Sequence, residues 1–221
     1  MNSKELSLSC VNNGKPFTMY YEKDRFIQEV LIDKEYEKLI EKQLLERHDL
    51  VILDLGCNIG SFSLSLYDNA KDIYALDFSQ GCIDLLTTTK EVNGFDKLHI
   101  YKQAIAGTNR PVKVTSLSVT DGGNTIYGDK DEIQAITLAT FFHNVGLTHV
   151  DLLKVDIEGA ENEIFKADDF KEIAPHIHTI IGEAHTNTIP PGLEDAGYEC
   201  SVEGYKFVAT YGNNRTLHQE L

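Results

Sequence analysis

Short apolar runs alternate with amphipathic stretches along most of the chain after residue 49. Near-continuous apolar runs are typical of strands buried in a parallel sheet, whereas apolar residues at intervals of three and four predict helices. The runs predict strands at 50–55, 72–76, 98–102, 150–155 and 177–181. The amphipathic stretches predict helices at 60–67, 79–92, 138–145 and 160–166. This alternation favours an α/β fold with a doubly wound, mostly parallel sheet.

The N-terminal part of the chain has a different pattern. Two strand-like runs, 6–11 and 16–21, flank a turn signal at 12–15. Apolar residues at helical spacing then predict one amphipathic helix over 26–46. We therefore predict an N-terminal strand and helix extension at 1–48, followed by a second domain at 49–221.

Hairpins are predicted at two other places. Near the C-terminus, a short helix from 190 to 197 precedes strands 198–202 and 205–211, which form a hairpin around Glu203-Gly204. A second hairpin is predicted around 121–124, where glycine and asparagine separate two strand-like runs, 112–120 and 125–127.

Acidic residues outnumber basic ones in this chain of 221 residues. Asp and Glu number 35 and Lys and Arg number 20, so the formal net charge is −15. Such a surface repels phosphate on average, which argues against a nucleic-acid partner. No apolar run approaches the ~18 residues of a membrane span, and the first ten residues lack a signal-peptide pattern. The four cysteines have no metal-binding or disulfide spacing, so we expect a cytoplasmic protein with reduced thiols and no membrane contact.

A glycine-rich turn follows the first predicted strand of the second domain. It reads Asp54-Leu55-Gly56-Cys57-Asn58-Ile59-Gly60, and its glycines let the backbone approach a ligand closely. Asn58 stands where a dinucleotide fingerprint requires glycine, so no pyrophosphate cradle is predicted. Asp54 is suited to hold the cationic amino group of an amino-acid ligand. The alternative interpretation is an ordinary strand–helix turn.

Asp77 follows the second strand, 17 residues after Gly60. An acidic residue at this place accepts hydrogen bonds from both hydroxyls of a ribose. The alternative is a cap for the helix that begins near Ser79. Together, the turn and Asp77 predict a ligand with an adenosine and a charged amino-acid end, and S-adenosylmethionine matches that description.

Charged residues gather at the ends of the fourth and fifth strands. Lys154, Asp156 and Glu158 share one strand parity, and Glu183 and His185 share a face of the next strand. Charges on one side of a central strand are costly unless they are paired or face a cleft. We therefore assign Lys154, Asp156, Glu158 and His185 to the catalytic site. Asp156 or Glu158 is the preferred general base, and His185 is the rival.

Each of these residues also has a simpler interpretation. Lys154 forms an ion pair, Asp156 and Glu158 end a strand and cap a helix, and His185 is a loop histidine. Glu161 is an ordinary first-turn acid of the next helix. A divalent cation is an alternative occupant of these carboxylates and the imidazole, but no separate ligand motif is present, so no metal is predicted.

Four blocks of the sequence resemble the FkbM-type methyltransferases, a family of class I S-adenosylmethionine-dependent methyltransferases. The blocks read VILDLGCNIGSFSL, IYALDFS, HVDLLKVDIEGAENEIF and IIGEAH, and they extend from Leu50 to His185. The third block is the most specific, because the family has a Lys-x-Asp-x-Glu-Gly-x-Glu run at this place. The resemblance implies a Rossmann-like, seven-stranded, mostly parallel sheet that closes with the C-terminal antiparallel hairpin. It also implies O-methylation of a hydroxyl group on a small molecule or a glycan.

The resemblance also implies which residues bind the cofactor. The family positions correspond to Asp54, Gly56, Cys57, Asn58 and Gly60 in the turn, Asp77 at the ribose, Phe78 at the adenine face, and Gln103 and Ala104 at the adenine edge. The chain departs from the family where Asp77-Phe78 replaces a frequent Glu-Pro and where Ala139 replaces a frequent Asp. Two alternatives remain, a non-catalytic module that binds S-adenosylmethionine and a nicotinamide-dependent oxidoreductase, which would need glycine in place of Asn58.

Overall fold

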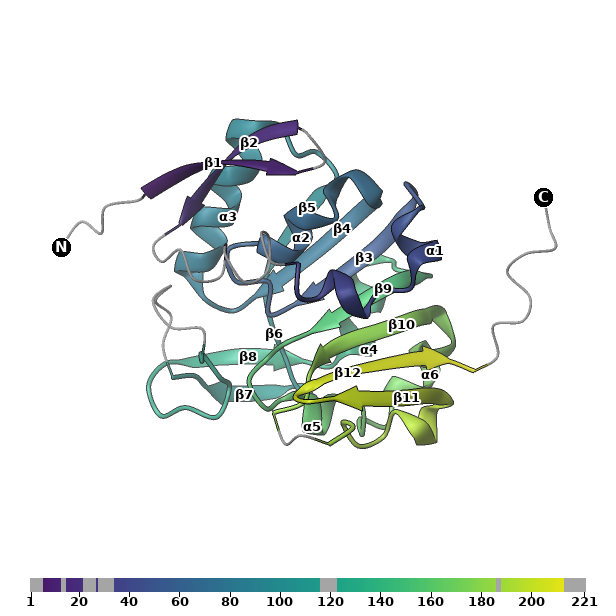
Figure 1. The fold of residues 1–221 in the computed structure, drawn as a ribbon. Helices are drawn as coiled ribbons and strands as arrows, with labels where there is room; N and C mark the ends of the chain where they lie inside the picture. The colour runs from purple at the N-terminus through teal and green to yellow at the C-terminus, as the bar shows by residue number, and fades with distance from the viewer. Residues whose placement is uncertain are drawn as a thin grey trace.

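The computed structural model describes residues 6–12, 15–21, 27, 34–115, 123–185 and 188–212, and a seven-stranded sheet forms its centre (Figure 1). The strand order is β11-β12-β10-β9-β3-β4-β5. The parallel strands are β3 (Leu50–Leu55), β4 (Ala70–Asp77), β5 (Leu98–Lys102), β9 (Val150–Val155) and β10 (Ile177–Glu183). The antiparallel hairpin consists of β11 (Tyr198–Glu203) and β12 (Lys206–Tyr211). This sheet confirms the predicted fold class.

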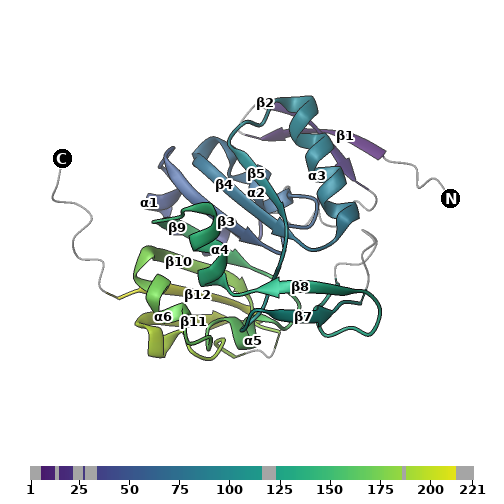
Figure 2. The same ribbon diagram turned by 180° about the vertical axis from the view of Figure 1, so that it is seen from behind.

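Helices cover both faces of the sheet, and each face has its own apolar core. Leu50 and Ile52 of β3 face a cluster that contains side chains of α1 (Lys42–Leu45), α2 (Ser61–Ser65) and α3 (Gln80–Asn93). Leu53 and Leu55 face the opposite cluster, with α4 (Leu138–Val145), α5 (Glu161–Ile164) and α6 (Phe170–Ile173). Figure 2 shows α4 and α6 on this second face. Neighbouring strand residues point to opposite faces, so one apolar run serves both cores.

The predicted helices of the second domain are present, although several are short. The one predicted near 190–197 is a single 3-10 turn, η5 (Glu194–Ala196), and two more 3-10 turns are η3 (Tyr67–Asn69) and η4 (Ala174–His176). None of the helices in the described part of the chain combines the length and apolar character that crossing a bilayer requires.

The N-terminal hairpin lies against α3. Its strands, β1 (Leu6–Asn12) and β2 (Lys15–Tyr21), pair antiparallel around the predicted turn. The Thr18 amide donates to Asn93 Oδ1 at 2.8 Å, and Asn93 Nδ2 donates to Thr18 O at 2.7 Å. The Tyr20 amide donates to Thr89 Oγ1 at 3.0 Å. These bonds join the hairpin to the domain that begins at residue 49, and the division at residue 48 stays a prediction.

The prediction of one continuous helix over 26–46 is wrong in its described part. The structure has a 3-10 turn, η2 (Glu37–Leu39), and then α1, separated by Ile40 and Glu41 with extended ψ angles of 132° and 138°. Residues 26 and 28–33 of the prediction lie outside the described residues. Tyr36, Ile40 and Leu44 are nevertheless all buried. The spacing therefore identified the buried side chains, but tertiary contacts rather than helix periodicity determine the backbone between them.

A small second sheet follows the end of β5. It has the order β6-β8-β7, with β6 (Ala104–Ile105), β8 (Glu132–Ile136) and β7 (Arg110–Lys113). The hairpin predicted around 121–124 is present only in part among the described residues. The Thr115 amide donates to Thr125 O at 3.2 Å, but the one bridge of Tyr127, to Lys113, is parallel, and the regular antiparallel partner of β7 is β8. Residues 116–122 lie outside the described residues. β8 has only five residues, and Glu132 and Gln134 interrupt its apolar positions, which explains why no apolar run marks it in the sequence.

The buried carboxylate of Asp151 joins β9 to β3 near the N-terminal ends of these two strands. Asp151 accepts hydrogen bonds from the Val51 amide at 2.8 Å and from Arg47 Nη1 at 2.6 Å, and it lies 3.0 Å from His149 Nε2. Burial raises the pKa of Asp151, but these partners outweigh it and lower the pKa to about 2. Asp151 is therefore ionised at any pH at which the protein is ordinarily handled.

Candidate active site

The glycine-rich turn lies between β3 and α2, at the carboxyl end of the sheet. Gly56 has a φ of +71°, and the carbonyl oxygen of Asp156 occupies the place where a Cβ atom of Gly56 would lie. The amides of Gly56 and Cys57 both donate to Leu76 O, at 3.0 and 2.9 Å. Glycine is needed here because the turn passes directly beside the backbone that follows β9. The turn thereby brings the ends of β3, β4 and β9 together.

A cleft of about 880 Å³, including its open mouth, lies beside this turn. Most of the predicted site residues line it, namely Gly56, Cys57, Asn58, Asp77, Phe78, Gln103, Ala104, Lys154, Asp156 and Glu158. Three predicted residues, Asp54, Gly60 and His185, are not in this lining. Gly60 faces α3 instead, where the Leu86 side chain fills the place that a Cβ atom would need. The sheet order explains the gathering, because parallel strands end at one edge.

Asp54 and Lys154 form a buried ion pair behind the turn. The Asp54 carboxylate has no exposed surface, accepts a hydrogen bond from Ser63 Oγ at 2.7 Å and lies 3.4 Å from Lys154 Nζ. Lys154 Nζ also donates to Gly56 O at 2.8 Å and lies 3.6 Å from Asp156 Oδ2. Burial lowers the pKa of Lys154, but the charges of Asp54 and Asp156 outweigh it and raise the pKa. Lys154 is thus both ion-paired and part of the cleft lining.

Asp77 lies at the end of β4 with its carboxylate held by backbone amides. Oδ2 accepts a hydrogen bond from the Asn58 amide at 3.0 Å, and Oδ1 accepts one from the Ser79 amide at 2.8 Å. Burial raises the pKa of Asp77, although these two amides act in the opposite direction. Its carbonyl oxygen accepts from the Gln103 amide at 3.0 Å. A carboxylate has about four acceptor sites, so Asp77 retains capacity for ligand hydroxyls.

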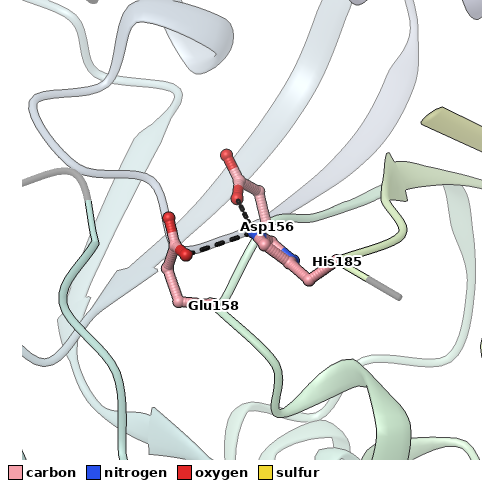
Figure 3. A group of neighbouring side chains, drawn as sticks. All are labelled: Asp156, Glu158 and His185. Atoms are coloured by element: carbon pink, nitrogen blue, oxygen red, sulfur yellow. Dashed lines mark ion pairs between the residues drawn. The ribbon is translucent and has the colours of Figure 1, made fainter. Parts of the chain in front are cut away.

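Four carboxylates surround His185 at the ends of β9 and β10, and Figure 3 shows two of them. His185 Nε2 lies 3.2 Å from Glu158 Oε2, 4.0 Å from Asp156 Oδ1 and 3.9 Å from Glu183 Oε2. On the other side of the ring, Nδ1 lies 2.5 Å from Glu161 Oε1. The structure therefore brings together the residues that the sequence assigned to catalysis, although they come from two strands.

A turn, and not strand parity, places Glu158. β9 ends at Val155, and Glu158 has a φ of +52°, so the predicted common strand parity of Asp156 and Glu158 is wrong. Glu161, the first residue of α5, stabilises this turn because both of its carboxylate oxygens accept from the Gly159 amide, at 3.2 and 3.0 Å. The convergence on His185 is therefore a property of the turn between β9 and α5.

The crowded charges shift two pKa values in this cluster. Hydrogen bonds with Glu158 and Glu161 raise the pKa of His185 to about 10. Burial, together with the charge of Asp156, raises the pKa of Glu183 to about 7. Negative charge at this edge of the cleft therefore exceeds the positive charge of the imidazole and of Lys154, and this edge favours a cationic ligand.

Tyr36 is a site residue that the sequence did not reveal. Its hydroxyl donates to Asp156 Oδ2 at 3.0 Å and lies 3.3 Å from Glu183 Oε1. Burial, then the charge of Asp156, raises the pKa of Tyr36. In the sequence, Tyr36 is one apolar position of a helical pattern, and nothing near it indicates that its hydroxyl meets two carboxylates.

Some of the other residues that line the cleft have a local signal in the sequence, and others have none. Ser61 and Phe62 also line the cleft, and their position directly after Gly60 is a local signal that could have found them. Asn124 and Ile126 reach the cleft from the segment between β7 and β8. No short-range pattern connects that segment to the glycine-rich turn.

A parallel sheet of this order, closed by an antiparallel hairpin and with a glycine-rich turn and an acidic strand end at one cleft, is the class I methyltransferase fold. The model of the family described as "Methyltransferase FkbM domain" matches residues 38–200. The chain belongs to this family, and residues 38–200 are a domain of S-adenosylmethionine-dependent methyltransferases.

Individual proteins are similar to parts of the chain. An uncharacterized protein of Haemophilus influenzae is 27% identical over 101 residues, which are 45% of this chain and 38% of that protein. The 23S rRNA (uracil(1939)-C(5))-methyltransferase RlmD of Colwellia psychrerythraea is 28% identical over 114 residues, 45% of this chain and 24% of RlmD. The matches thus span well under half the length of these curated relatives.

Solved methyltransferase structures are similar to this chain in fold. The T. thermophilus 16S rRNA N2 G1207 methyltransferase RsmC, solved with AdoMet and guanosine, has a TM-score of 0.51 and 13% identity. The match covers 93% of this chain and 50% of RsmC. At this identity the likeness concerns the fold alone.

Proposed function

We propose that this protein transfers a methyl group from S-adenosylmethionine to a hydroxyl group of a small molecule or a glycan. The observation that carries the proposal is a single cleft with two chemically different sides. In the sheet order, Asp77 and Gln103 follow β4 and β5 on one side of β3, whereas Asp156 and Glu158 follow β9 on the other side. The first side suits an adenosine, and the second suits the sulfonium group and an acceptor.

The residues of the first side fit an adenosyl ligand. We assign binding of the ribose hydroxyls to Asp77, and contact with the adenine ring to Phe78, Gln103 and Ala104. The backbone of Gly56, Cys57 and Asn58 is the part of the turn that the ligand approaches. Gly56 supports this assignment because it has no Cβ atom in the crowded turn, and Asp77 supports it because backbone amides hold its carboxylate. Asp54 and Gly60 act indirectly, through Lys154 and through the packing of α2 on α3.

The second side supplies what proton removal requires. S-adenosylmethionine, when bound, supplies an electrophilic methyl carbon on its sulfonium sulfur. The acceptor oxygen attacks this carbon, the electron pair of the broken C–S bond remains on sulfur, and the hydroxyl proton passes to a carboxylate. We assign that role to Asp156 or Glu158, since both line the cleft and His185 does not. Lys154 and Tyr36 hold Asp156 in position.

A nucleic acid is the second candidate acceptor. RlmD and RsmC are both named as rRNA methyltransferases. The net charge of −15 favours a neutral or cationic acceptor over RNA. Incubating the protein with labelled S-adenosylmethionine and either ribosomal RNA or a panel of hydroxylated metabolites and glycans separates the two. Label in RNA alone would contradict our choice of acceptor. The alternative of a nicotinamide-dependent oxidoreductase is not favoured, because the chain belongs to a methyltransferase family.

Calorimetry with S-adenosylhomocysteine tests the cofactor site. We expect binding to the wild type, and at least tenfold weaker binding to Asp77→Asn, because hydrogen bonds of a charged acceptor contribute about 1.5–3 kcal/mol. Asp72→Asn is the matched control, since Asp72 lies on the same strand but outside the cleft lining. No binding at millimolar ligand would refute the proposal.

Turnover tests the catalytic assignment once an acceptor is found. Asp156→Asn and Glu158→Gln are compared with the wild type at saturating cofactor. We expect at least one of them to lower turnover a hundredfold or more, the usual contribution of a general base. If neither lowers turnover tenfold, the assignment is wrong. If the ligand binds but no acceptor is methylated, the alternative of a non-catalytic binding module gains support.

A further inference from the structure

Asp156 and Glu158 each direct one carboxylate oxygen toward the imidazole of His185, beside the cleft (Figure 3). Donor atoms of Asp156, Glu158 and His185 all lie within 4.8 Å of one another. His185 Nε2 is 3.2 Å from Glu158 Oε2 and 4.0 Å from Asp156 Oδ1. An octahedral ion with ligands at about 2.1 Å holds adjacent ligands about 3.0 Å apart and opposite ligands about 4.2 Å apart. Both separations from His185 Nε2 lie between these two values.

A second layer of buried groups orients these donors. Glu161, which has no exposed surface, faces His185 Nδ1 and so directs Nε2 toward the two carboxylates. Tyr36, which is 2% exposed, donates to Asp156 Oδ2, while Oδ1 faces the imidazole. In metal centres the ligating histidine donates its other ring N–H to a carboxylate, a backbone carbonyl or a water, and ligating carboxylates are themselves hydrogen-bonded. An ordinary acidic surface patch needs no such buried layer behind it.

We propose that Asp156, Glu158 and His185 bind one divalent cation of the Mn²⁺ type. Carboxylates suit Mg²⁺ and Mn²⁺, and an imidazole suits first-row transition metals, so Mn²⁺ matches the mixed donor set. Because Asp156 and Glu158 line the cleft, the ion is accessible from it.

The use of this ion in catalysis rests on the proposed methyl transfer, whereas its binding does not. A hydroxyl bound to a divalent cation loses its proton more readily. Glu158 offers Oε2 to the ion and retains Oε1 to accept that proton, so its proposed roles as ligand and as base are compatible. The inference therefore adds a substrate requirement, namely an acceptor oxygen that binds a hard cation.

Titration of the chelator-treated, full-length protein with MnCl₂, followed by electron paramagnetic resonance, tests the site. We expect one bound Mn²⁺ per chain, and at least tenfold weaker binding to Glu158→Gln. Glu161→Gln should also weaken binding, by about 10–100-fold, although Glu161 is not a ligand. Glu163→Gln is the matched control, because the side chains of Glu158 and Glu163 are both 30% exposed. Its affinity should stay within twofold of the wild type.

Three results would overturn the inference. The first is that the wild type binds no Mn²⁺ up to about 1 mM, which is the weak end of protein cation sites. The second is that Glu163→Gln and Glu158→Gln lose affinity for Mn²⁺ equally. The third is that Glu158→Gln binds Mn²⁺ as tightly as the wild type. Circular dichroism establishes that each variant is folded. Calorimetry with S-adenosylhomocysteine on the same chelator-treated protein separates the two proposals. Loss of ion binding alone refutes the metal site, whereas failure to bind the nucleoside alone refutes the methyltransferase proposal.

Discussion

Replacing Lys154 with methionine should destabilise the fold by about 3–5 kcal/mol, because it removes one partner of a buried ion pair. Asp54 has no exposed surface, so its carboxylate would keep Ser63 Oγ, at 2.7 Å, as its described side-chain partner and lose the ammonium at 3.4 Å. Part of that cost, about 1.5–3 kcal/mol, comes from the lost hydrogen bond of the charged ammonium to Gly56 O at 2.8 Å. Methionine retains most of the apolar stem of Lys154, so the loss is chiefly electrostatic.

The double variant, Asp54→Asn with Lys154→Met, should recover most of this loss, since no buried charge is then left without its partner. Urea unfolding followed by circular dichroism measures both. With a slope of about 2 kcal/mol per molar, a loss of 4 kcal/mol lowers the midpoint by about 2 M. Lys102→Met, at an exposed strand end, is the control and should change stability by less than about 0.5 kcal/mol. A cost below about 1 kcal/mol for Lys154→Met, or no recovery in the double variant, would refute this reasoning.

Three further predictions concern other parts of the fold. Gly56→Ala should abolish binding of S-adenosylhomocysteine, because the new Cβ atom overlaps the Asp156 carbonyl oxygen, and unchanged affinity by calorimetry would contradict this. In the folded protein the pKa of Asp151 is about 2, below its ordinary value of 3.8. The ionised carboxylate therefore adds about 2 kcal/mol to the free energy of unfolding above pH 4, and this contribution is lost as the pH falls through 2. The urea midpoints of wild type and Asp151→Asn should therefore differ at pH 7 and converge near pH 2, and a constant difference would show that ionisation is not the cause. Asn93→Ala removes the partner of both backbone groups of Thr18, so hydrogen exchange by mass spectrometry should quicken in β1–β2 but not in β9.

The parts of the fold that could be predicted have short-range signals. β3, β5 and β9 have the predicted boundaries, because apolar residues are concentrated in each of these segments. α3 begins after Ser79, whose side chain accepts from the Cys82 amide, and ends before Gly94 in a left-handed conformation. The segment after Tyr36 and the small sheet with β8 depend instead on contacts with distant elements, so spacing along the chain does not determine them.

The same distinction applies to the candidate site. The glycine-rich turn and Asp77 have local signatures, and the structure places both beside the cleft. Tyr36 meets Asp156 across 120 residues of sequence, and no pattern in one sequence reports such a pair. Glu161 also has the appearance of an ordinary first-turn acid, and only its burial against His185 distinguishes it.

The position of β12 has a consequence for the protein while it is being synthesised. β12 is the last described strand along the chain, yet it lies inside the sheet between β10 and β11. A nascent chain that has not yet released residues 206–211 from the ribosome therefore exposes the edge of β10, an apolar strand whose ladder is half complete. Open edges of this kind are sites of association with other chains. Slow translation or truncation just before β12 should thus be more damaging than the small size of that strand suggests.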